Sequence, residues 1–534
     1  MFKFLKHYIK QSKIKFLLFM SFSVLSWALS LTLPLLNGRL IDVITLGVDR
    51  EALWNIIIII SILSLFSLGM SYFTSIIFRQ IITYIMQMIN DKLVNHIHQL
   101  SIKFSYNLNT VYLTQRIMAD ANTISNFTLT SVRDFPLGIV AIIFNIVILI
   151  HINLLMGLVL LILIPIYIVL FFSFRKKMYQ KNLAYKEAES HYFEEMNSQI
   201  ENIKFIKINA LKNMFWSNFW ENFSNLFESL MIYTKISTLF SNLGSFITVC
   251  ANIIVLVFGV NEIFDGNLTI GQFTIILTYF NMVIGNIDYF LNFLKNYQTT
   301  LVSYNRLNDI LKLETENIGK QILKDIESIE FKEVSFSYNN ESLIKNFSYK
   351  FEKGKIYRIQ GQNGSGKSTL MDLLLGLHED YTGKIILNNV DLRDINLYRM
   401  RKELVAFVEQ NLTIINGTIK QNIKLDEEIA HERFTYLKDQ LNLTTFLERN
   451  SLELMLSSKS IEFSGGEKQK INILRNLLKE SKLLMLDEAN SALDADSEME
   501  LKEILYNEKK DRITILIVHT DIFKDIIDVE INLS

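Results

Sequence analysis

The stretch Gly361-Gln362-Asn363-Gly364-Ser365-Gly366-Lys367-Ser368-Thr369 decides the fold of the second half of the chain. It fits the pattern G-x-x-x-x-G-K-[ST], in which glycines let backbone N–H groups face phosphate oxygens at the start of a helix. The flanking residues predict a strand over 355–360 and a helix over 368–376, which is the context that such a loop requires. Lys367 would place a charge on the β- and γ-phosphates of a nucleotide, and Ser368 a hydroxyl on Mg²⁺.

About 115 residues downstream, Leu483-Leu484-Met485-Leu486 is a continuous apolar run that predicts a buried parallel strand. Two acids end it. Asp487 is placed to hold Mg²⁺ through water, and Glu488 to accept a proton from an attacking water as a general base. The alternative interpretation is a pair of solvated acids at the end of a strand.

The residues ahead of the loop are strongly apolar. Stretches of about 20 apolar residues can cross a bilayer as helices. Six occur, at 16–36, 54–78, 135–151, 153–174, 236–260 and 268–292. The third and fourth meet at residues 151–153, which predicts a tight hairpin. We therefore expect a membrane unit over 1–312, a charged linker over 313–328 and a nucleotide-binding unit over 329–534.

Basic residues predict the orientation. Lysines and arginines gather in the N-terminal tail and in the long connections 79–134 and 175–235, whereas the turn at 151–153 has none. The positive-inside rule puts the N-terminus, both connections and the nucleotide-binding unit in the cytoplasm. A cleaved signal peptide over 1–36 is the rival interpretation. It is disfavoured because the run is too long, and because its removal would leave five spans and the ATP site outside.

Polar residues inside spans are costly and therefore informative. Asn145 in the third span and Asn281 and Asp288 in the sixth are candidates for a substrate cavity, and Asn286 also stands in the sixth. Hydrogen bonding between helices is the plainer alternative.

Composition sets further bounds. The net charge of -1 averages two different halves, and the single cysteine excludes an internal disulfide. The abundance of Ile, Asn, Lys and Phe indicates a bacterial source.

Phe463-Ser464-Gly465-Gly466-Glu467 resembles the LSGGQ signature of ABC ATPases. Gln410 matches that family's Q-loop glutamine, Ser491-Ala492-Leu493-Asp494 its D-loop, and His519 its switch histidine. Over nearly its whole length the chain resembles the type IV ABC exporters, the P-glycoprotein-like group that includes bacterial peptide, lipid and multidrug exporters.

The resemblance implies an all-α membrane unit of six helices with long intracellular extensions, followed by an α/β P-loop ABC nucleotide-binding unit. It implies short coupling helices near 104–112 and 210–219. It implies ATP and Mg²⁺ as cofactors, with catalysis by Glu488, His519, Gln410 and Lys367. The ATP-binding residues would be Tyr338, Gly361, Asn363, Gly364, Ser365, Gly366, Lys367, Ser368 and Thr369, with Ser464, Gly465 and Gly466 acting across a subunit boundary. Asp494 belongs to the D-loop, and Mg²⁺ would be held by Ser368, Gln410 and Asp487.

The sequence departs from the family pattern at several positions. Phe463 and Glu467 replace the signature's Leu and Gln, Ser458-Lys459-Ser460 stands where an E-x-G is usual, and Glu409 replaces a common proline. Fifteen residues follow His519, so we expect the customary C-terminal strand and helices to be missing.

One chain holds six spans and one motor while the signature acts across a boundary, so the resemblance implies a dimer. A homodimer is favoured over a heterodimer because every catalytic position is intact. The implied function is ATP-driven export of a peptide (bacteriocin-like or modified) or an amphiphile across the cytoplasmic membrane by alternating access. Lipid flipping and multidrug efflux are alternatives. A different class is an ATP-gated channel or membrane sensor that moves no cargo. Membrane lipids are expected partners, and nucleic acid is not, since the spans exclude a soluble ATPase acting on DNA or ribosomes.

Overall fold

The computed structural model describes residues 3–47, 50–105, 110–338, 341–410, 413–425, 430–456, 463–490 and 493–533. Its internal contacts divide the chain into two compact units. The first consists of Met1–Leu100 and Asn107–Glu314, and the second of Ser101–Tyr106 and Thr315–Ser534.

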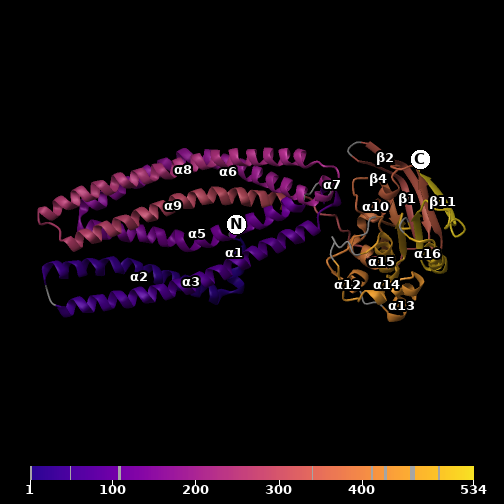
Figure 1. Ribbon diagram of the computed structural model, residues 1–534, viewed down its shortest axis with the longest axis horizontal. Helices are drawn as coiled ribbons and strands as arrows, with labels where there is room; N and C mark the ends of the chain where they lie inside the picture. Colours follow the sequence, from indigo (N-terminus) through magenta and orange to yellow (C-terminus); the bar gives the residue numbers. More distant parts are fainter. Residues whose placement is uncertain are drawn as a thin grey trace. The chain divides into compact units, whose positions relative to one another are not determined.

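The first unit is built from long helices (Figure 1). They are α1 (Lys3–Gln11), α2 (Lys13–Leu46), α3 (Arg50–His98), α5 (Thr110–Ile152), α6 (Leu154–Glu201), α7 (Ile203–Ile208), α8 (Lys212–Phe264) and α9 (Ile270–Leu311). Among the described residues α2, α3, α5, α8 and α9 are long and apolar enough to cross a membrane. Residues 154–174 of the fourth predicted span form the first part of α6.

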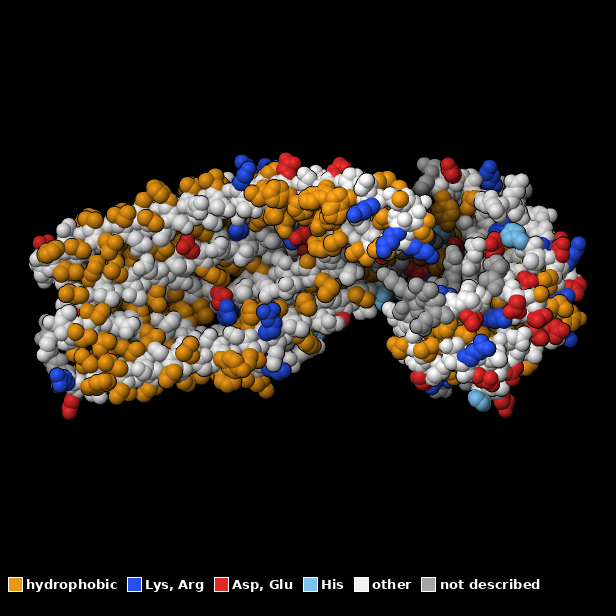
Figure 2. Space-filling model, viewed as in Figure 1, with side chains coloured by type: hydrophobic (Ala, Val, Ile, Leu, Met, Phe, Trp, Pro, Cys, Tyr) orange, Lys and Arg blue, Asp and Glu red, His pale blue; other side chains and the backbone are white. Residues whose placement is uncertain are grey.

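The outward faces of these helices are apolar, as a lipid environment requires. Side chains such as Ile58, Ile62 and Leu65 of α3 are 52%, 60% and 69% exposed. Figure 2 shows hydrophobic side chains spread over the helical unit, whereas charged side chains gather on the other unit. Inside the bundle, Tyr279 and Phe280 of α9 are fully buried.

The hairpin between α5 and α6 is confirmed. Asn153 alone separates the two helices, and its side-chain Oδ1 accepts a hydrogen bond from the Leu155 amide at 3.0 Å. The three prolines of the chain, Pro34, Pro136 and Pro165, all lie inside α2, α5 and α6. Membrane helices tolerate such prolines because neighbouring helices and hydroxyl side chains satisfy the freed backbone groups.

A buried ion pair joins three helices where they extend beyond the predicted spans. Arg306 of α9 and Asp120 of α5 are 5% and 2% exposed, with Nε and Oδ2 3.4 Å apart. The Ser303 hydroxyl donates to Asp120 Oδ1 at 2.8 Å. Arg306 Nη2 donates to the Ser190 hydroxyl of α6 at 3.0 Å. The ion pair and these two bonds compensate charges that would be costly to bury alone, although Asp120 Oδ2 and Arg306 Nε have no hydrogen-bond partner among the described residues.

The second unit contains an antiparallel and a parallel sheet. The antiparallel sheet has the order β2-β1-β4-β5 and the parallel sheet the order β11-β3-β10-β9-β6, beside the small pair β7-β8. The strands are β1 (Ser328–Tyr338), β2 (Glu341–Glu352), β3 (Ile356–Gly361), β4 (Thr382–Leu387), β5 (Val390–Asp391), β6 (Val405–Val408), β7 (Gly417–Thr418), β8 (Met455–Leu456), β9 (Leu483–Asp487), β10 (Ile513–Ile517) and β11 (Val529–Leu533).

Helices surround these sheets. They are α4 (Ile102–Ser105), α10 (Lys367–Leu374), α11 (Leu397–Arg399), α12 (Ile419–Lys424), α13 (His431–Gln440), α14 (Thr444–Arg449), α15 (Gly465–Leu478) and α16 (Ala495–Glu508), with short 3₁₀ or π segments at Leu392–Asp394, Met400–Leu404 and Lys509–Asp511.

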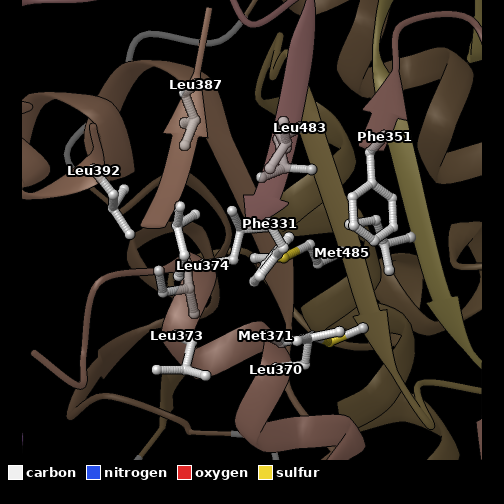
Figure 3. Packing of buried hydrophobic residues seen from close by; sticks show 14 of the residues in the cluster. Phe331, Phe351, Leu370, Met371, Leu373, Leu374, Leu387, Leu392, Leu483 and Met485 are labelled. Atoms are coloured by element: carbon white, nitrogen blue, oxygen red, sulfur yellow. The ribbon is translucent and has the colours of Figure 1, made fainter. Parts of the chain in front are cut away.

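One hydrophobic core lies between the two sheets and α10 (Figure 3). Phe331 of β1, Met371 of α10 and Met485 of β9 meet there, each 1% exposed or less. Fully burying each such side chain stabilises the fold by about 1.5–3 kcal/mol. This packing fixes α10, and with it the glycine loop at its N-terminus.

Two expectations about short elements are wrong. The second short helix is α7, Ile203–Ile208, and residues 212–219 begin α8. Ala210, with φ 54°, separates the two because the left-handed backbone interrupts the helix. A strand does follow His519, since β11 pairs in parallel with β3 from Val529 to Leu533. The first predicted coupling helix corresponds to α4, and residues 106–109 lie outside the described residues.

We predict that Arg306→Met will lower the free energy of unfolding by about 3–5 kcal/mol, because it removes the ion-pair partner of the buried Asp120 carboxylate. Thermal unfolding of the purified protein in detergent measures this. Lys312→Met is the matched control, since its ion pair with Asp309 at 3.2 Å is largely exposed and should be worth less than ~1 kcal/mol. Equal effects of the two substitutions would contradict the assigned role of Arg306.

Candidate active site and membrane cavity

Three neighbouring parallel strands place the predicted catalytic side chains at one edge of the sheet. β9 pairs with β10 on one side and with β6 on the other, with Leu486 opposite both Leu516 and Val408. The carboxyl ends of parallel strands meet at the same edge. Gln410, Glu488 and His519 follow these three strand ends, one after each.

Glu488 lies at the centre of this group. Its Oε2 accepts a hydrogen bond from Gln410 Nε2 at 2.6 Å, and its Oε1 is 3.0 Å from His519 Nε2. The Glu488 backbone has φ 48°, a left-handed conformation that non-glycine residues rarely adopt. Its amide donates to the Ile517 carbonyl at 2.9 Å, which holds this turn against β10. The structure therefore brings three of the four predicted catalytic residues into direct contact.

The glycine loop connects β3 to α10. Gly366 caps α10 with φ 94°, and a Cβ on Gly361 would lie 2.5 Å from the Leu533 carbonyl oxygen of β11. Both positions therefore require glycine. Lys367 is 8% exposed, and its Nζ donates to the carbonyls of Gly361 and Gln362 at 2.9 and 3.0 Å.

The other loop residues differ in burial. Asn363, Gly364 and Ser368 are exposed, Ser365 is half-buried, and Thr369 is buried. A cavity of about 460 Å³ beside the loop is lined by residues that include Gly361, Lys367 and His519.

The acids near the loop form a negative cluster. Burial raises the pKa of Asp487 above its usual value, and the Glu488 charge raises it further, whereas the Ser368 hydroxyl and Lys367 oppose the shift. Burial, together with the charges of Asp487 and Glu409, also raises the pKa of Asp372 on α10 to about 6. Carboxylates that repel one another in this way are stabilised by a cation.

The donors near this cluster fit Mg²⁺. The Ser368 hydroxyl, the Gln410 amide oxygen and the Asp487 carboxylate are oxygen ligands of the kind that Mg²⁺ prefers. Within the described part of the chain no three His, Cys, Asp or Glu side chains gather as a metal site. A small set of protein oxygens suits an ion that takes its remaining ligands from water and phosphate.

The signature residues begin α15. Ser464 is its N-cap and forms a capping box with Glu467, in which each side chain accepts a hydrogen bond from the other residue's amide. Glu467 is therefore a competent replacement for glutamine at this position. Phe463 is buried against Phe446, with ring centroids 5.0 Å apart. Gly465 and Gly466 form the first turn of the helix.

Asp494 caps α16 and connects it to α15. Its carboxylate accepts hydrogen bonds from the Ser497 amide and from Lys470 Nζ, both at 2.8 Å. The bond from Lys470, and then those from Ser497, lower the pKa of Asp494 below its usual value. Ser491 and Ala492 of the predicted D-loop, and residues 458–460, lie outside the described residues.

Tyr338 ends β1 with a 40% exposed side chain. Its hydroxyl is 2.8 Å from His378 Nε2. An exposed aromatic ring held at its far end is compatible with base stacking.

Asn490 belongs to none of the sequence motifs, yet the structure gives it a role beside the site. It is 6% exposed, and its Nδ2 donates to Glu498 Oε1 at 2.6 Å and to the Thr520 hydroxyl at 3.1 Å. It thus ties the loop after Glu488 to α16 and to the residue that follows His519. The sequence offers no signal for this role beyond its position after the apolar strand.

The first unit contains a polar cavity of about 450 Å³ between α2, α3, α5 and α9. Hydroxyl side chains line two walls, namely Ser23, Ser26 and Ser30 of α2 and Ser67, Ser71, Thr74 and Ser75 of α3. Arg133 and Asp134 of α5, which are hydrogen bonded to each other, Asn286 and Tyr289 of α9, and Trp27, Leu137 and Gly138 complete the lining.

Of the polar residues singled out in the predicted spans, Asn286 lines this cavity, whereas Asn145, Asn281 and Asp288 are not among its lining residues. Asn145 is fully buried in α5, with both side-chain polar atoms lacking a partner among the described residues. Asn281 is exposed, and its Nδ2 donates to the Leu277 carbonyl. Asp288 is half-buried. The serines could have been found from the sequence, because their spacing of three or four residues places them on one face of each helix.

Comparison with known proteins agrees with this architecture. A family model described as "ABC transporter transmembrane region" matches residues 16–287, and one described as "ABC transporter" matches residues 344–491. A putative export ATP-binding/permease protein of Rickettsia bellii is 28% identical, over 89% of this chain and 83% of its own. An ATP-dependent lipid A-core flippase of Desulfotalea psychrophila is 27% identical, over 87% of this chain and 82% of its own.

A solved structure has the same fold. The structure of a bacterial Atm1-family ABC exporter with ATP bound superposes with a TM-score of 0.90, covering 98% of this chain and 94% of the other at 18% identity. The membrane model alone spans more than half of the chain. The chain therefore belongs to the ABC transporter family, as a multi-pass exporter-type member whose ATPase unit drives transport.

Proposed function

We propose that this chain is one half of a Mg²⁺-dependent exporter that moves a peptide or an amphiphile out across the cytoplasmic membrane by alternating access. The observation that carries the motor part is the Glu488 carboxylate held between Gln410 and His519, beside the glycine loop. A general base must be held within hydrogen-bonding distance of the water whose proton it takes.

The side chains divide the chemistry among them. Lys367 and the loop amides bind the β- and γ-phosphates of ATP, and Tyr338 stacks on the base. Glu488 takes a proton from the attacking water, and His519 orients Glu488 and contacts the γ-phosphate. Ser368, Gln410 and Asp487 would hold Mg²⁺, which neutralises charge on the phosphates.

The intact set of catalytic positions supports a homodimer, and exposed apolar side chains on α7 and at the start of α8 support a protein interface there. Ile203, Phe205 and Ile208 are 54%, 54% and 71% exposed. Trp216 and Trp220 at the start of α8 are 53% and 50% exposed. Such a patch marks a protein interface. In the dimer, Ser464, Gly465, Gly466 and Asp494 of one copy complete the ATP site of the other.

The polar cavity supports a cargo with hydrogen-bonding groups, such as a peptide or the head group of an amphiphile. Its serines offer donors and acceptors, and Arg133 and Asp134 offer both charges. Lipid flipping is the second candidate, since the Desulfotalea relative is named a lipid A-core flippase.

Glu488→Gln should lower ATP turnover at least ~100-fold, because the general base is lost. ATP binding should persist, since the substitution leaves the glycine loop intact. Phosphate release and binding of a fluorescent ATP analogue, both in lipid nanodiscs, measure the two effects. Glu503→Gln on the exposed face of α16 is the control. Residual turnover near the wild-type rate would assign the base elsewhere.

ATPase stimulation across peptides, lipids and amphiphilic drugs tests the cargo. Ser71→Leu should raise the cargo concentration for half-maximal stimulation about fivefold, the equivalent of one lost hydrogen bond. Ser61→Leu, on the exposed side of α3, should leave it unchanged. Stimulation by lipids alone would favour the flippase, and a rate that no cargo changes would favour a sensor or channel.

The proposed orientation predicts that a membrane-impermeant maleimide added to intact cells labels Ile152→Cys and not Lys212→Cys. Both variants carry Cys250→Ser, which removes the native thiol. Position 152 lies at the α5–α6 turn and position 212 at the start of α8. The reverse labelling pattern would invert the topology.

A further inference from the structure

Three aromatic rings form a cluster at the end of β1 in the second unit. Phe336 and Tyr338 belong to this strand, and His378 lies in the segment that follows α10. The centroid of the His378 ring is 4.8 Å from that of Phe336 and 5.3 Å from that of Tyr338. Phe336 and His378 are buried, whereas Tyr338 is 40% exposed. The cluster therefore combines two buried rings with one that reaches the surface.

His378 contacts Tyr338 through a ring nitrogen. The Tyr338 hydroxyl and His378 Nε2 are 2.8 Å apart, which is a hydrogen-bonding distance. The two rings are perpendicular, with an interplanar angle of 86°, and the rings of Phe336 and Tyr338 enclose the same angle. Neither neighbour is therefore stacked in parallel on Tyr338. The hydrogen bond fixes the far end of a ring that could otherwise change its rotamer.

The surroundings of His378 favour a neutral imidazole. Burial lowers the pKa of His378 below its usual value, and the Asp380 charge only partly opposes this shift. One nitrogen of a neutral imidazole accepts a hydrogen bond. His378 Nε2 can therefore accept a hydrogen bond from the Tyr338 hydroxyl.

The segment that carries His378 is anchored on both sides. Before it, the Leu375 carbonyl accepts a hydrogen bond from Arg401 Nε at 2.7 Å. After it, the Glu379 carboxylate accepts a hydrogen bond from the Asn317 amide at 2.9 Å. The segment continues directly from α10, the helix that begins at the glycine loop. His378 therefore occupies a fixed position relative to the residues that bind phosphate.

We propose that His378 is a positioning residue for nucleotide binding, which holds Tyr338 in the orientation in which the tyrosine ring stacks on the base of ATP. The inference rests on the stacking role proposed above for Tyr338. A ring whose orientation is set before binding gains more from stacking, because less side-chain freedom is lost. Since His378 contacts Tyr338 and not the phosphates, it acts on the affinity for the base and not on the chemistry at the γ-phosphate.

A purely structural role of His378 is the alternative. The fold alone does not require an imidazole here, because an apolar side chain would fill the space and water could satisfy the hydroxyl of the partly exposed Tyr338. The two roles differ in the quantity that a substitution changes. A structural role predicts lower stability at an unchanged affinity for ATP, whereas a positioning role predicts a weaker affinity.

The Michaelis constant for ATP, measured with the full-length protein in lipid nanodiscs, tests the proposal. His378→Leu should raise this constant about fivefold, the equivalent of one lost hydrogen bond, whereas kcat should change less. Tyr338→Phe, which removes only the hydroxyl, should raise the constant equally, and the double variant should raise it no further. His378→Gln, whose amide can bond to the hydroxyl, should restore most of the affinity. Tyr398→Phe, at a 64% exposed position of α11, is the matched control.

A ligand without a base separates this effect from damage to the whole site. Inorganic tripolyphosphate competes for the glycine loop, and its inhibition constant should be the same in the wild type and in His378→Leu. An unchanged Michaelis constant in Tyr338→Phe would overturn the proposal. So would a rise in the inhibition constant of tripolyphosphate that equals the rise in the Michaelis constant for ATP. If His378→Leu does not fold, Tyr338→Phe alone decides.

Tyr338→Ala distinguishes failure of this inference from failure of the proposed stacking. Loss of the ring should raise the Michaelis constant for ATP at least about fivefold, given the strength of stacking between a base and an aromatic ring. If Tyr338→Ala has this effect and His378→Leu does not, the role of His378 is wrong and the stacking stands. If Tyr338→Ala has no effect, Tyr338 does not stack on the base, and the role of His378 fails with it.

Discussion

The parallel pairing of β9 with β6 and β10 determines where the chemistry of the second unit takes place. A shift of one residue in either ladder would turn the side chains that follow each strand toward the opposite face. With the observed register, the Gln410 amide and the His519 imidazole, from two distant parts of the chain, meet the Glu488 carboxylate. The buried runs of β9 and β10 hold this register because every side chain in them is packed.

The same unit carries local strain at its centre. The left-handed backbone of Glu488 and the raised pKa of Asp487 are both unfavourable when considered alone. The hydrogen bond from Glu488 to Ile517 and the contacts of Asn490 keep the segment in place. Features of this kind persist only where the surrounding structure determines them, and they cluster at functional sites.

The sequence alone predicted the features that depend on long residue patterns. Apart from one or two residues at the starts of the fourth and sixth, the predicted spans fall within long helices, because the backbone polar groups of a chain that crosses a bilayer must be satisfied within the segment. The glycine loop and the acids after β9 were also located, since their spacing is tied to a strand and a helix. The position of α7 was not predictable, because it depends on the backbone of a single alanine, Ala210.

Features set by distant partners were also missed. β11 forms because β3 offers it an edge, although more than 160 residues separate the two strands. Asn286 lines the polar cavity, but Asn145, Asn281 and Asp288 do not, because polarity within a span does not reveal which neighbour a side chain faces. The serines of α2 and α3 indicate the cavity better, because their spacing of three or four residues places them on one face of each helix.

The single residue between α5 and α6 has a mechanical consequence. With Asn153 as the only link, neither helix can slide along the other at that end, so relative motion there is restricted to a pivot. The arms are long, 43 and 48 residues. At about 1.5 Å per residue, a tilt of about 5° at the pivot swings the far end of α6 by about 6 Å. Such a pair of helices acts as a lever, in which a small opening between the spans corresponds to a large displacement of α7.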